Sequence, residues 1–345
     1  MQYKKLAGTD LNVSRICLGT MTFGKQNTQQ QAFEQLDLAL DQGVNFIDTA
    51  ELYPVPTSAQ TQCLTEQYIG QWIKARANRN KLIIGTKVCG PAPMVEYLRP
   101  NIAHDENNIR AAVEGSLKRL NTDYIDLYQL HWPDRQTNFF GQLGYEHDSS
   151  NDGTPLRETL FVLKQLVDEG KIRYVGVSNE SPWGVMSFLQ LAKEFDLPRI
   201  SSVQNAYSLL NRTTEIGLAE VLYRENIDLL AYSPLGFGVL TGKYLDGALP
   251  KNSRLDLFPQ YSRYQTTNGV IATKKYVELA NKYAIDPAQM AIAFVASRPF
   301  VGSTIIGATN LGQLSNAISA IDLNVSEQLV KDIESIHNTC HNPCP

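Results

Sequence analysis

The chain has no long run of basic residues and no long run of apolar residues. Its 31 Lys and Arg residues are fewer than its 35 Asp and Glu residues, so the formal net charge is −4. Binding to nucleic acid or to an anionic membrane calls for clustered positive charge. No stretch of about 18 apolar residues occurs that could span a bilayer, and residues 1–8 have no apolar signal core. The sequence therefore predicts a cytoplasmic protein without a nucleic-acid or membrane partner.

Cysteine is also scarce. The five cysteines are an odd number, and Cys17, Cys63 and Cys89 lie far apart in the chain. This pattern does not fit a disulfide framework. The Cys- and His-containing tail could ligate a soft metal, yet it is short and terminal. We expect no metal site and a loosely ordered tail over residues 337–345.

No low-complexity segment is present, and the composition is that of an ordinary globular protein. Hydrophobic residues make up 43% of the chain and charged residues 19%. The 345 residues could form one domain or two by length alone, since α/β barrels exceed the average domain size. We expect a single barrel domain over residues 1–345.

Short β-branched runs alternate with longer amphipathic segments, which is typical of repeated βα units around a parallel sheet. The predicted strands are residues 15–18, 45–48, 82–87, 124–130, 174–178, 200–204, 229–233 and 303–306. The predicted helices are residues 30–41, 65–77, 105–120, 155–169, 182–195, 214–225 and 287–297. Eight strands match a closed barrel, so the predicted fold class is α/β, a (β/α)8 TIM barrel.

Three segments lie outside the eightfold repeat. Residues 1–12 contain a Gly-Thr-Asp turn and predict an N-terminal β-hairpin that closes the bottom of the barrel. Residues 133–154 and residues 236–268 are long loops that follow predicted strands. Long loops in a compact domain are usually functional or disordered. We expect function, because barrel active sites lie at the carboxyl ends of the strands.

Four polar residues follow or end consecutive predicted strands: Asp48, Tyr53, Lys87 and His131. Each one alone has a simple structural explanation, such as a helix cap, a rim side chain or a packed loop histidine. In a barrel, however, the ends of consecutive strands converge on one face. The consistent order therefore predicts one shared site.

A tyrosine beside a lysine, a carboxylate and a histidine can act as a general acid. The phenol of a free tyrosine titrates near pH ~10, and a nearby ammonium favours phenolate and lowers that pKa. The carboxylate would keep the lysine charged and in place. We expect Lys87 to lower the pKa of Tyr53, which would suit the phenol to protonate a carbonyl oxygen while hydride reaches the carbonyl carbon.

The first predicted strand is not followed by a G-x-G-x-x-G motif. The segment LGTM at residues 18–21 lacks that glycine spacing, so a Rossmann pyrophosphate site is not available. A nucleotide would have to bind in another way.

Six segments carry a resemblance to a known family. They are LGTMTFG at residues 18–24, DTAELYPVP at 48–56, YIDLYQLHWP at 124–133, GKIRYVGVSN at 170–179, LAYSPL at 230–235 and IGAT at 306–309. On these motifs the chain resembles the aldo-keto reductase superfamily, in particular its bacterial Tas-like branch. The resemblance extends from Tyr3 to about Ile336. It implies a barrel that binds NADPH along its C-terminal face and reduces aldehydes or ketones to alcohols.

Catalytic roles carry over from the resemblance position by position. Tyr53 would be the proton donor, Lys87 and Asp48 would tune it, and His131 would orient the substrate carbonyl. The pocket wall would include Trp132 and, in addition, Met21, Phe23 and the aromatic residues of the 133–154 loop, in which Phe139 and Phe140 could equally act as simple latches.

Cofactor contacts also carry over. Ser178, Asn179 and Gln204 would hold the nicotinamide carboxamide, and Tyr232 would stack on its ring. Lys243 and Arg254 would bind the adenosine 2′-phosphate and so favour NADPH. The remaining predicted contacts, along the cofactor's length, are Thr20, Met21, Ser233, Leu235, Gly307, Thr309, Gln313 and Asn316.

Two departures from the family pattern concern the adenosine end. Gly307 stands where many relatives have Lys or Arg, so recognition of the 2′-phosphate depends on Lys243 and Arg254. Asn316-Ala317 stands where relatives often have Glu-Asn, which leaves Asn316 as the adenine-facing amide.

Two other functions remain open from the sequence. One is a regulatory subunit that keeps the fold and the cofactor but acts through a partner. Such a protein would resemble the potassium-channel β subunits. The other is an isomerase or lyase on the same barrel, which would not bind nicotinamide. The sequence does not indicate the oligomeric state.

Overall fold

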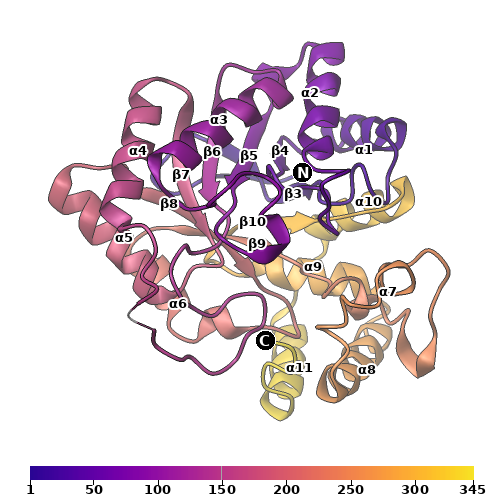
Figure 1. Ribbon diagram of the computed structural model, residues 1–345. Helices are drawn as coiled ribbons and strands as arrows, with labels where there is room; N and C mark the ends of the chain where they lie inside the picture. Colours follow the sequence, from indigo (N-terminus) through magenta and orange to yellow (C-terminus); the bar gives the residue numbers. More distant parts are fainter. Residues whose placement is uncertain (149) are drawn as a thin grey trace.

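The computed structural model describes residues 1–148 and 150–345, and within them eight parallel strands form a closed barrel (Figure 1). The strands are β3 (Ile16–Gly19), β4 (Phe46–Asp48), β5 (Ile83–Val88), β6 (Ile125–Leu130), β7 (Ile172–Ser178), β8 (Ile200–Ala206), β9 (Asp228–Tyr232) and β10 (Val301–Ile306). Each strand pairs with the next, and β10 closes the ring on β3 with Ile306 opposite Leu18. The predicted TIM-barrel class is confirmed.

The helices surround the barrel, as Figure 1 shows. They are α1 (Gln29–Asp41), α2 (Leu64–Arg76), α3 (Glu106–Leu120), α4 (Leu156–Asp168), α5 (Pro182–Phe195), α6 (Leu218–Arg224), α9 (Pro287–Ser297) and α10 (Leu311–Ser319). Because helices cover the outside and side chains fill the inside, every residue of β4, β5, β6 and β10 is buried. This explains why the strands appear in the sequence as continuous apolar runs.

Helix starts follow local capping chemistry. Thr28 and Gln31 form a capping box before α1, and Asp105, Ser181 and Asp286 accept a backbone N–H at the starts of α3, α5 and α9. The predicted helix over residues 214–225 is interrupted. Gly217, with a φ of 90°, separates a short 3₁₀ turn (Thr213–Glu215) from α6.

Four of the described α-helices do not appear among the predicted ones. Two of them are α8 (Thr267–Lys282), which follows the short α7 (Arg254–Leu257), and α11 (Glu327–Thr339). They pack on each other, and Lys282 forms an ion pair with Asp332 at 2.9 Å. The other two are α7 itself and α10, which follows β10. The inserted loop therefore leads into a helical layer beside the barrel.

The N-terminal hairpin closes the bottom of the barrel, as predicted. It consists of β1 (Tyr3–Lys5) and β2 (Asn12–Ser14), paired antiparallel. Leu6, Leu11 and Val13 are buried in one cluster with side chains from inside the barrel, including Phe46 and Leu230. These apolar contacts seal the end of the barrel opposite the active-site loops.

The tail that we expected to be loosely ordered makes defined contacts. Asn342 Oδ1 accepts the backbone N–H of Arg212 at 2.6 Å, and the Cys344 N–H donates to Leu210 O at 3.1 Å. The Cys344 side chain is buried among core residues. The sequence does not show that the residues after α11 pack on the barrel, because this packing depends on a surface formed by segments distant in the chain.

None of the described helices combines the length and the apolar character that crossing a membrane would require.

Candidate active site

The strand ends bring Asp48 and Lys87 together in the barrel interior. The Lys87 ammonium Nζ lies 2.7 Å from Asp48 Oδ2 and donates a second hydrogen bond to Thr49 O at 2.7 Å. Lys87 is fully buried. A buried ammonium is tolerated only with charge and hydrogen-bond compensation, and both are present here.

Tyr53 and His131 complete the predicted group. The Lys87 Nζ lies 5.1 Å from the centroid of the Tyr53 ring, and the rings of Tyr53 and His131 meet edge to face with centroids 5.7 Å apart. Both side chains are buried. The four side chains therefore gather in one place, although they come from three different strand ends.

The predicted effect of Lys87 on the tyrosine is wrong. Burial raises the pKa of the Tyr53 hydroxyl well above its ordinary value, and the Asp48 carboxylate raises it further. The Lys87 charge does not reverse this, because Asp48 compensates it at 2.7 Å. Tyr53 is consequently a protonated phenol around neutral pH, which is the form that can donate a proton.

His131 is a neutral imidazole. Burial lowers its pKa well below the ordinary value, and the neighbouring Lys87 charge lowers it further. The backbone on both sides is fixed, since His131 N–H donates to Val88 O at 2.9 Å and Asn179 Nδ2 donates to His131 O at 2.8 Å. A neutral, held imidazole can hydrogen-bond a carbonyl without adding a charge.

Two glutamines hold the other carboxylate oxygen of Asp48. Gln204 Nε2 donates to Asp48 Oδ1 at 2.8 Å and to Gln129 Oε1 at 3.1 Å, and Gln129 Nε2 lies 3.4 Å from Asp48 Oδ1. Gln129 was not among the predicted site residues. Its sequence signal is its place two residues before His131, on a strand whose alternate side chains point inward.

Glu51 is a second residue that the sequence reading missed, although it lies inside the DTAELY motif. Its carboxylate is buried, accepts the Cys89 backbone N–H at 2.8 Å and receives two hydrogen bonds from Arg99. The signal was a charged residue in an otherwise apolar loop, since buried carboxylates need a partner.

The residues predicted to contact the nicotinamide, three at its carboxamide and Tyr232 on its ring, are neighbours at the ends of β7, β8 and β9. Ser178 Oγ donates to Gln204 O at 2.8 Å, and Asn179 Nδ2 lies 3.1 Å from Ser178 Oγ. The Tyr232 hydroxyl donates to Asn179 Oδ1 at 2.7 Å. This group therefore borders the Asp48 and His131 cluster directly.

Residues 20, 21 and 23, which follow β3, lie in different surroundings. Thr20 is buried, and its Oγ1 donates to Asp48 O at 2.8 Å. Met21 packs at the edge of the apolar cluster that contains Tyr53 and Trp132. Phe23 is instead fully buried in the core between β3, α1 and α2. Its placement on the substrate pocket wall is therefore wrong, because the chain turns its ring toward the helices.

Lys243 lies in the loop after β9, and Arg254 is the first residue of the short α7 that follows. Lys243 Nζ is 5.1 Å from the Tyr244 ring centroid, and the Arg254 guanidinium is 4.9 Å from the Phe237 centroid. Burial lowers the pKa of Arg254, and its charge acts on Tyr53. Within the part of the chain that the structure describes, neither cation forms an ion pair with a carboxylate. Neither charge is therefore compensated by a carboxylate among these residues.

The backbone after β9 bends sharply at the predicted phosphate segment. Ser233 has a φ of 56°, and the Gly236 and Gly238 amides donate to Ser233 O and Leu235 O. A Cβ added to Gly238, whose φ is 90°, would come within 3.0 Å of Lys243 Nζ. Glycine at this position therefore leaves room for the lysine.

The segment after β10 leads into the N-terminus of α10. Gln313 Oε1 accepts from Thr309 N and Oγ1, each at 3.1 Å. Gly307 has open space where a side chain would project. Asn316 is engaged with α9, since it bonds Asp286 at 3.2 Å and Gln289 at 2.9 Å. An adenine contact of Asn316 would need those bonds to exchange.

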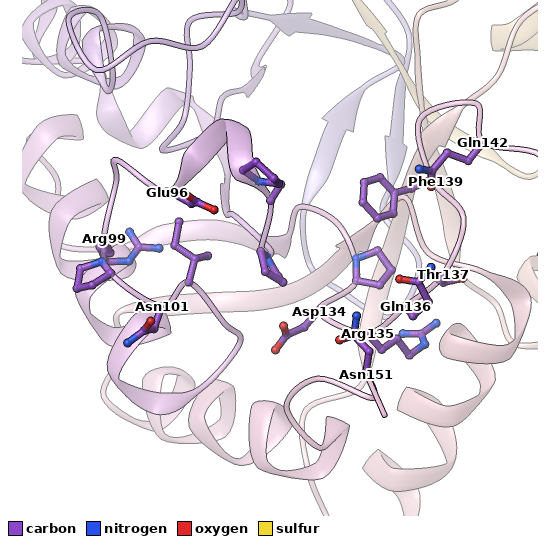
Figure 2. A pocket seen from close by; sticks show the side chains of 16 residues that line it. Glu96, Arg99, Asn101, Asp134, Arg135, Gln136, Thr137, Phe139, Gln142 and Asn151 are labelled. Atoms are coloured by element: carbon purple, nitrogen blue, oxygen red, sulfur yellow. The ribbon is translucent and has the colours of Figure 1, made fainter. Parts of the chain in front are cut away.

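A cavity of about 640 Å³ lies between the loop after β5 and the loop after β6, and its lining does not include the four clustered side chains. Figure 2 shows Glu96, Arg99 and Asn101 on one side of it and Gln136, Phe139 and Gln142 on the other. The Phe139 ring stacks on Trp132 at 6.3 Å. Trp132 Nε1 donates to Pro91 O at 3.2 Å. Trp132 thus joins both loops next to His131.

Comparison with known proteins gives one family. Residues 15–338 match the description "Aldo/keto reductase family". The chain is 51% identical to Protein tas of Escherichia coli over the whole of both chains. It is 31% identical to the uncharacterized oxidoreductase YrpG of Bacillus subtilis, over 97% of this chain and 96% of that one. It is also 31% identical to a probable voltage-gated potassium channel subunit beta of Arabidopsis thaliana, over 94% of this chain and 92% of that one.

Proposed function

Because this chain belongs to the aldo/keto reductase family, as a bacterial Tas-like member, we propose that it reduces aldehydes or ketones to alcohols with NADPH and with Tyr53 as the general acid. The observation that carries the proposal is the arrangement of Tyr53, Lys87, Asp48 and His131, with a protonated phenol beside a neutral imidazole. The bound nicotinamide would supply the hydride. The residues of the chain supply the proton and hold the carbonyl.

Proton transfer follows from this arrangement. As hydride reaches the carbonyl carbon, negative charge builds on the carbonyl oxygen, and the Tyr53 O–H donates its proton there. The Lys87 ammonium stabilises the phenolate that is left. The neutral His131 imidazole hydrogen-bonds the same carbonyl oxygen and orients it, and Trp132 limits access of water from one side.

The side chains present fit a dinucleotide with phosphates. Ser178, Asn179 and Gln204 offer the donors and acceptors that a carboxamide needs. Lys243 and Arg254 offer cations without carboxylate partners among the described residues. A phosphate would complete such cations with charge-assisted hydrogen bonds.

The cytoplasm is the compartment that we propose. Cys17, Cys63, Cys89, Cys340 and Cys344 are free thiols, two of which lie in the tail. Free thiols are the usual state in a reducing compartment.

The proposal is tested by mixing the purified protein with NADPH and a panel of aldehydes and following loss of NADPH absorbance. We expect turnover of benzaldehyde or a related aromatic aldehyde, because the wall around Tyr53 is aromatic. Tight binding of NADPH without turnover of any panel member would instead favour the second function, a regulatory subunit. The observation in favour of this second function is the similarity to a probable potassium channel subunit beta.

Lys243→Ala is expected to weaken NADPH binding about 10- to 100-fold, since a hydrogen bond to a charged group contributes roughly 1.5–3 kcal/mol. The affinity of the variant for NADH, which lacks the 2′-phosphate, should stay close to that of the wild type. Cofactor fluorescence titration measures both dissociation constants. Lys251→Ala, at an exposed lysine of the same loop, is the matched control. Equal losses for NADPH and NADH would refute the assignment of Lys243 to the 2′-phosphate.

A further inference from the structure

Residues 49–53 form the catalytic loop, and the first half of this loop is hydrogen-bonded to β5. The Thr49 N–H donates to Gly85 O at 2.8 Å and the Glu51 N–H to Lys87 O at 3.2 Å. The Glu51 side chain extends this contact, since its Oε1 accepts the Cys89 N–H at 2.8 Å. Glu51 thus lies between Tyr53, two residues ahead, and the backbone that carries Lys87.

Arg99 completes this contact from a third segment. Its Nη1 lies 2.5 Å from Glu51 Oε2 and its Nη2 lies 2.9 Å from Glu51 Oε1, so the two groups form a bidentate pair. Arg99 Nε also donates to Asn108 Oδ1 at 3.1 Å, in the first turn of α3. The guanidinium is therefore fixed in orientation by a helix outside the loop, and it is visible at the edge of the cavity in Figure 2.

The segment that carries Arg99 also supports the catalytic ring. Val95 and Ile102 are buried in one apolar cluster with Tyr53 and Trp132. A single loop thus supplies both the cation that holds Glu51 and side chains of the cluster in which Tyr53 is packed. Displacement of this loop would shift the phenol relative to Lys87 and His131.

We propose that Glu51 and Arg99 are positioning residues, which hold the Tyr53 hydroxyl in register with Lys87 and His131 by clamping the catalytic loop to β5 and to α3. This rests on the proposed reductase function, in which Tyr53 is the proton donor. Neither side chain touches the reacting atoms. Their effect is on geometry, and a displacement of about 1 Å can cost ~10²-fold in rate.

A second buried carboxylate provides a matched control. Glu66 on α2 is fully buried and, like Glu51, pairs with an arginine, Arg119, at 2.6 Å. Its other oxygen accepts from Thr86 Oγ1 at 2.6 Å. Both pairs tie buried charges between separate elements. The Glu66 pair, however, joins α2 to α3 and to Thr86 on β5, and among the described residues it forms no hydrogen bond with residues 48–53.

The experiment compares Glu51→Gln, Arg99→Lys and Glu66→Gln. The Gln substitutions keep the size and one acceptor oxygen, and Arg99→Lys keeps the charge but loses the bidentate geometry. We expect kcat with benzaldehyde and saturating NADPH to fall roughly 10- to 100-fold in Glu51→Gln and about 10-fold in Arg99→Lys. Glu66→Gln should keep kcat within about twofold of the wild-type value, because Glu66 does not hold the catalytic loop. This should be so even if the melting temperature of Glu66→Gln falls as far as that of Glu51→Gln. The dissociation constant of NADPH should not change in any variant.

Hydrogen exchange supplies a readout that does not require turnover. The peptide covering residues 48–56 should exchange faster in Glu51→Gln and Arg99→Lys than in wild type, and at the wild-type rate in Glu66→Gln. Equal loss of kcat in the Glu51 and Glu66 variants, or unchanged exchange of this peptide, would overturn the positioning role. If wild type reduces no aldehyde while the exchange pattern holds, the reductase proposal fails and the loop clamp stands.

Discussion

Tyr53→Phe is expected to lose ~10²- to 10⁴-fold in kcat, which is the usual contribution of a positioned general acid. The substitution removes one oxygen from a buried ring and leaves its packing with Trp132 and Val95 in place. The fold and NADPH affinity should therefore be kept. The measurement is the steady-state rate of NADPH oxidation with a saturating aldehyde, together with a fluorescence titration of the cofactor.

Tyr128→Phe is the control for this variant. Tyr128 is also fully buried, but it lies in the core cluster on the helix side of the barrel, and its hydroxyl has no hydrogen-bond partner among the described residues. Removal of that hydroxyl should leave kcat unchanged. A Tyr53→Phe enzyme with near wild-type kcat would show that another group protonates the substrate.

Lys87→Met is expected to reduce both stability and activity. The variant leaves the Asp48 carboxylate buried with Gln204 and Gln129 as its side-chain partners, and an uncompensated buried charge costs about 3–5 kcal/mol. The phenolate that forms on Tyr53 also loses its nearest cation, which should lower kcat by roughly 10²-fold. Urea unfolding gives the free energy of unfolding, and NADPH oxidation gives kcat.

The double variant Asp48→Asn/Lys87→Met separates the two effects. It removes both charges and keeps an amide for Gln204, so much of the lost stability should return. The activity should not return, because the cation beside Tyr53 is still absent. Recovery of kcat together with stability would mean that Lys87 serves folding alone.

Much of the barrel could be predicted because its strands are buried on both faces. The runs IIGTKV in β5 and YIDLYQL around β6 are rich in apolar and β-branched residues, with only Lys87, Asp126 and Gln129 as polar exceptions that are not β-branched. The structure places strands there within one or two residues. Closed-barrel geometry then brings the ends of consecutive strands together. The convergence of Asp48, Lys87 and His131 was predictable for this reason.

Two of the helices that were not predicted have a capping residue in the sequence. Ser326 caps α11 and Asn310 caps α10: in each case the side-chain oxygen accepts a hydrogen bond from a backbone N–H in the first turn of the helix. Both helices could thus have been proposed from cap signals. Glu51 likewise stood inside the catalytic motif, but its partner Arg99 is 48 residues away and no local pattern joins them.

The sequence by itself determined the order of strands and helices, the family motifs and the identity of the four central side chains, because these depend on local pattern and on covalent order. Only the tertiary structure decided that Phe23 turns into the core, that the tail docks by Cys344, and that Tyr53 keeps its proton. Burial and pairing set these outcomes. The pKa of a phenol depends on the water excluded from it and on whether a neighbouring ammonium is already compensated, and both are properties of packing between residues distant in the chain.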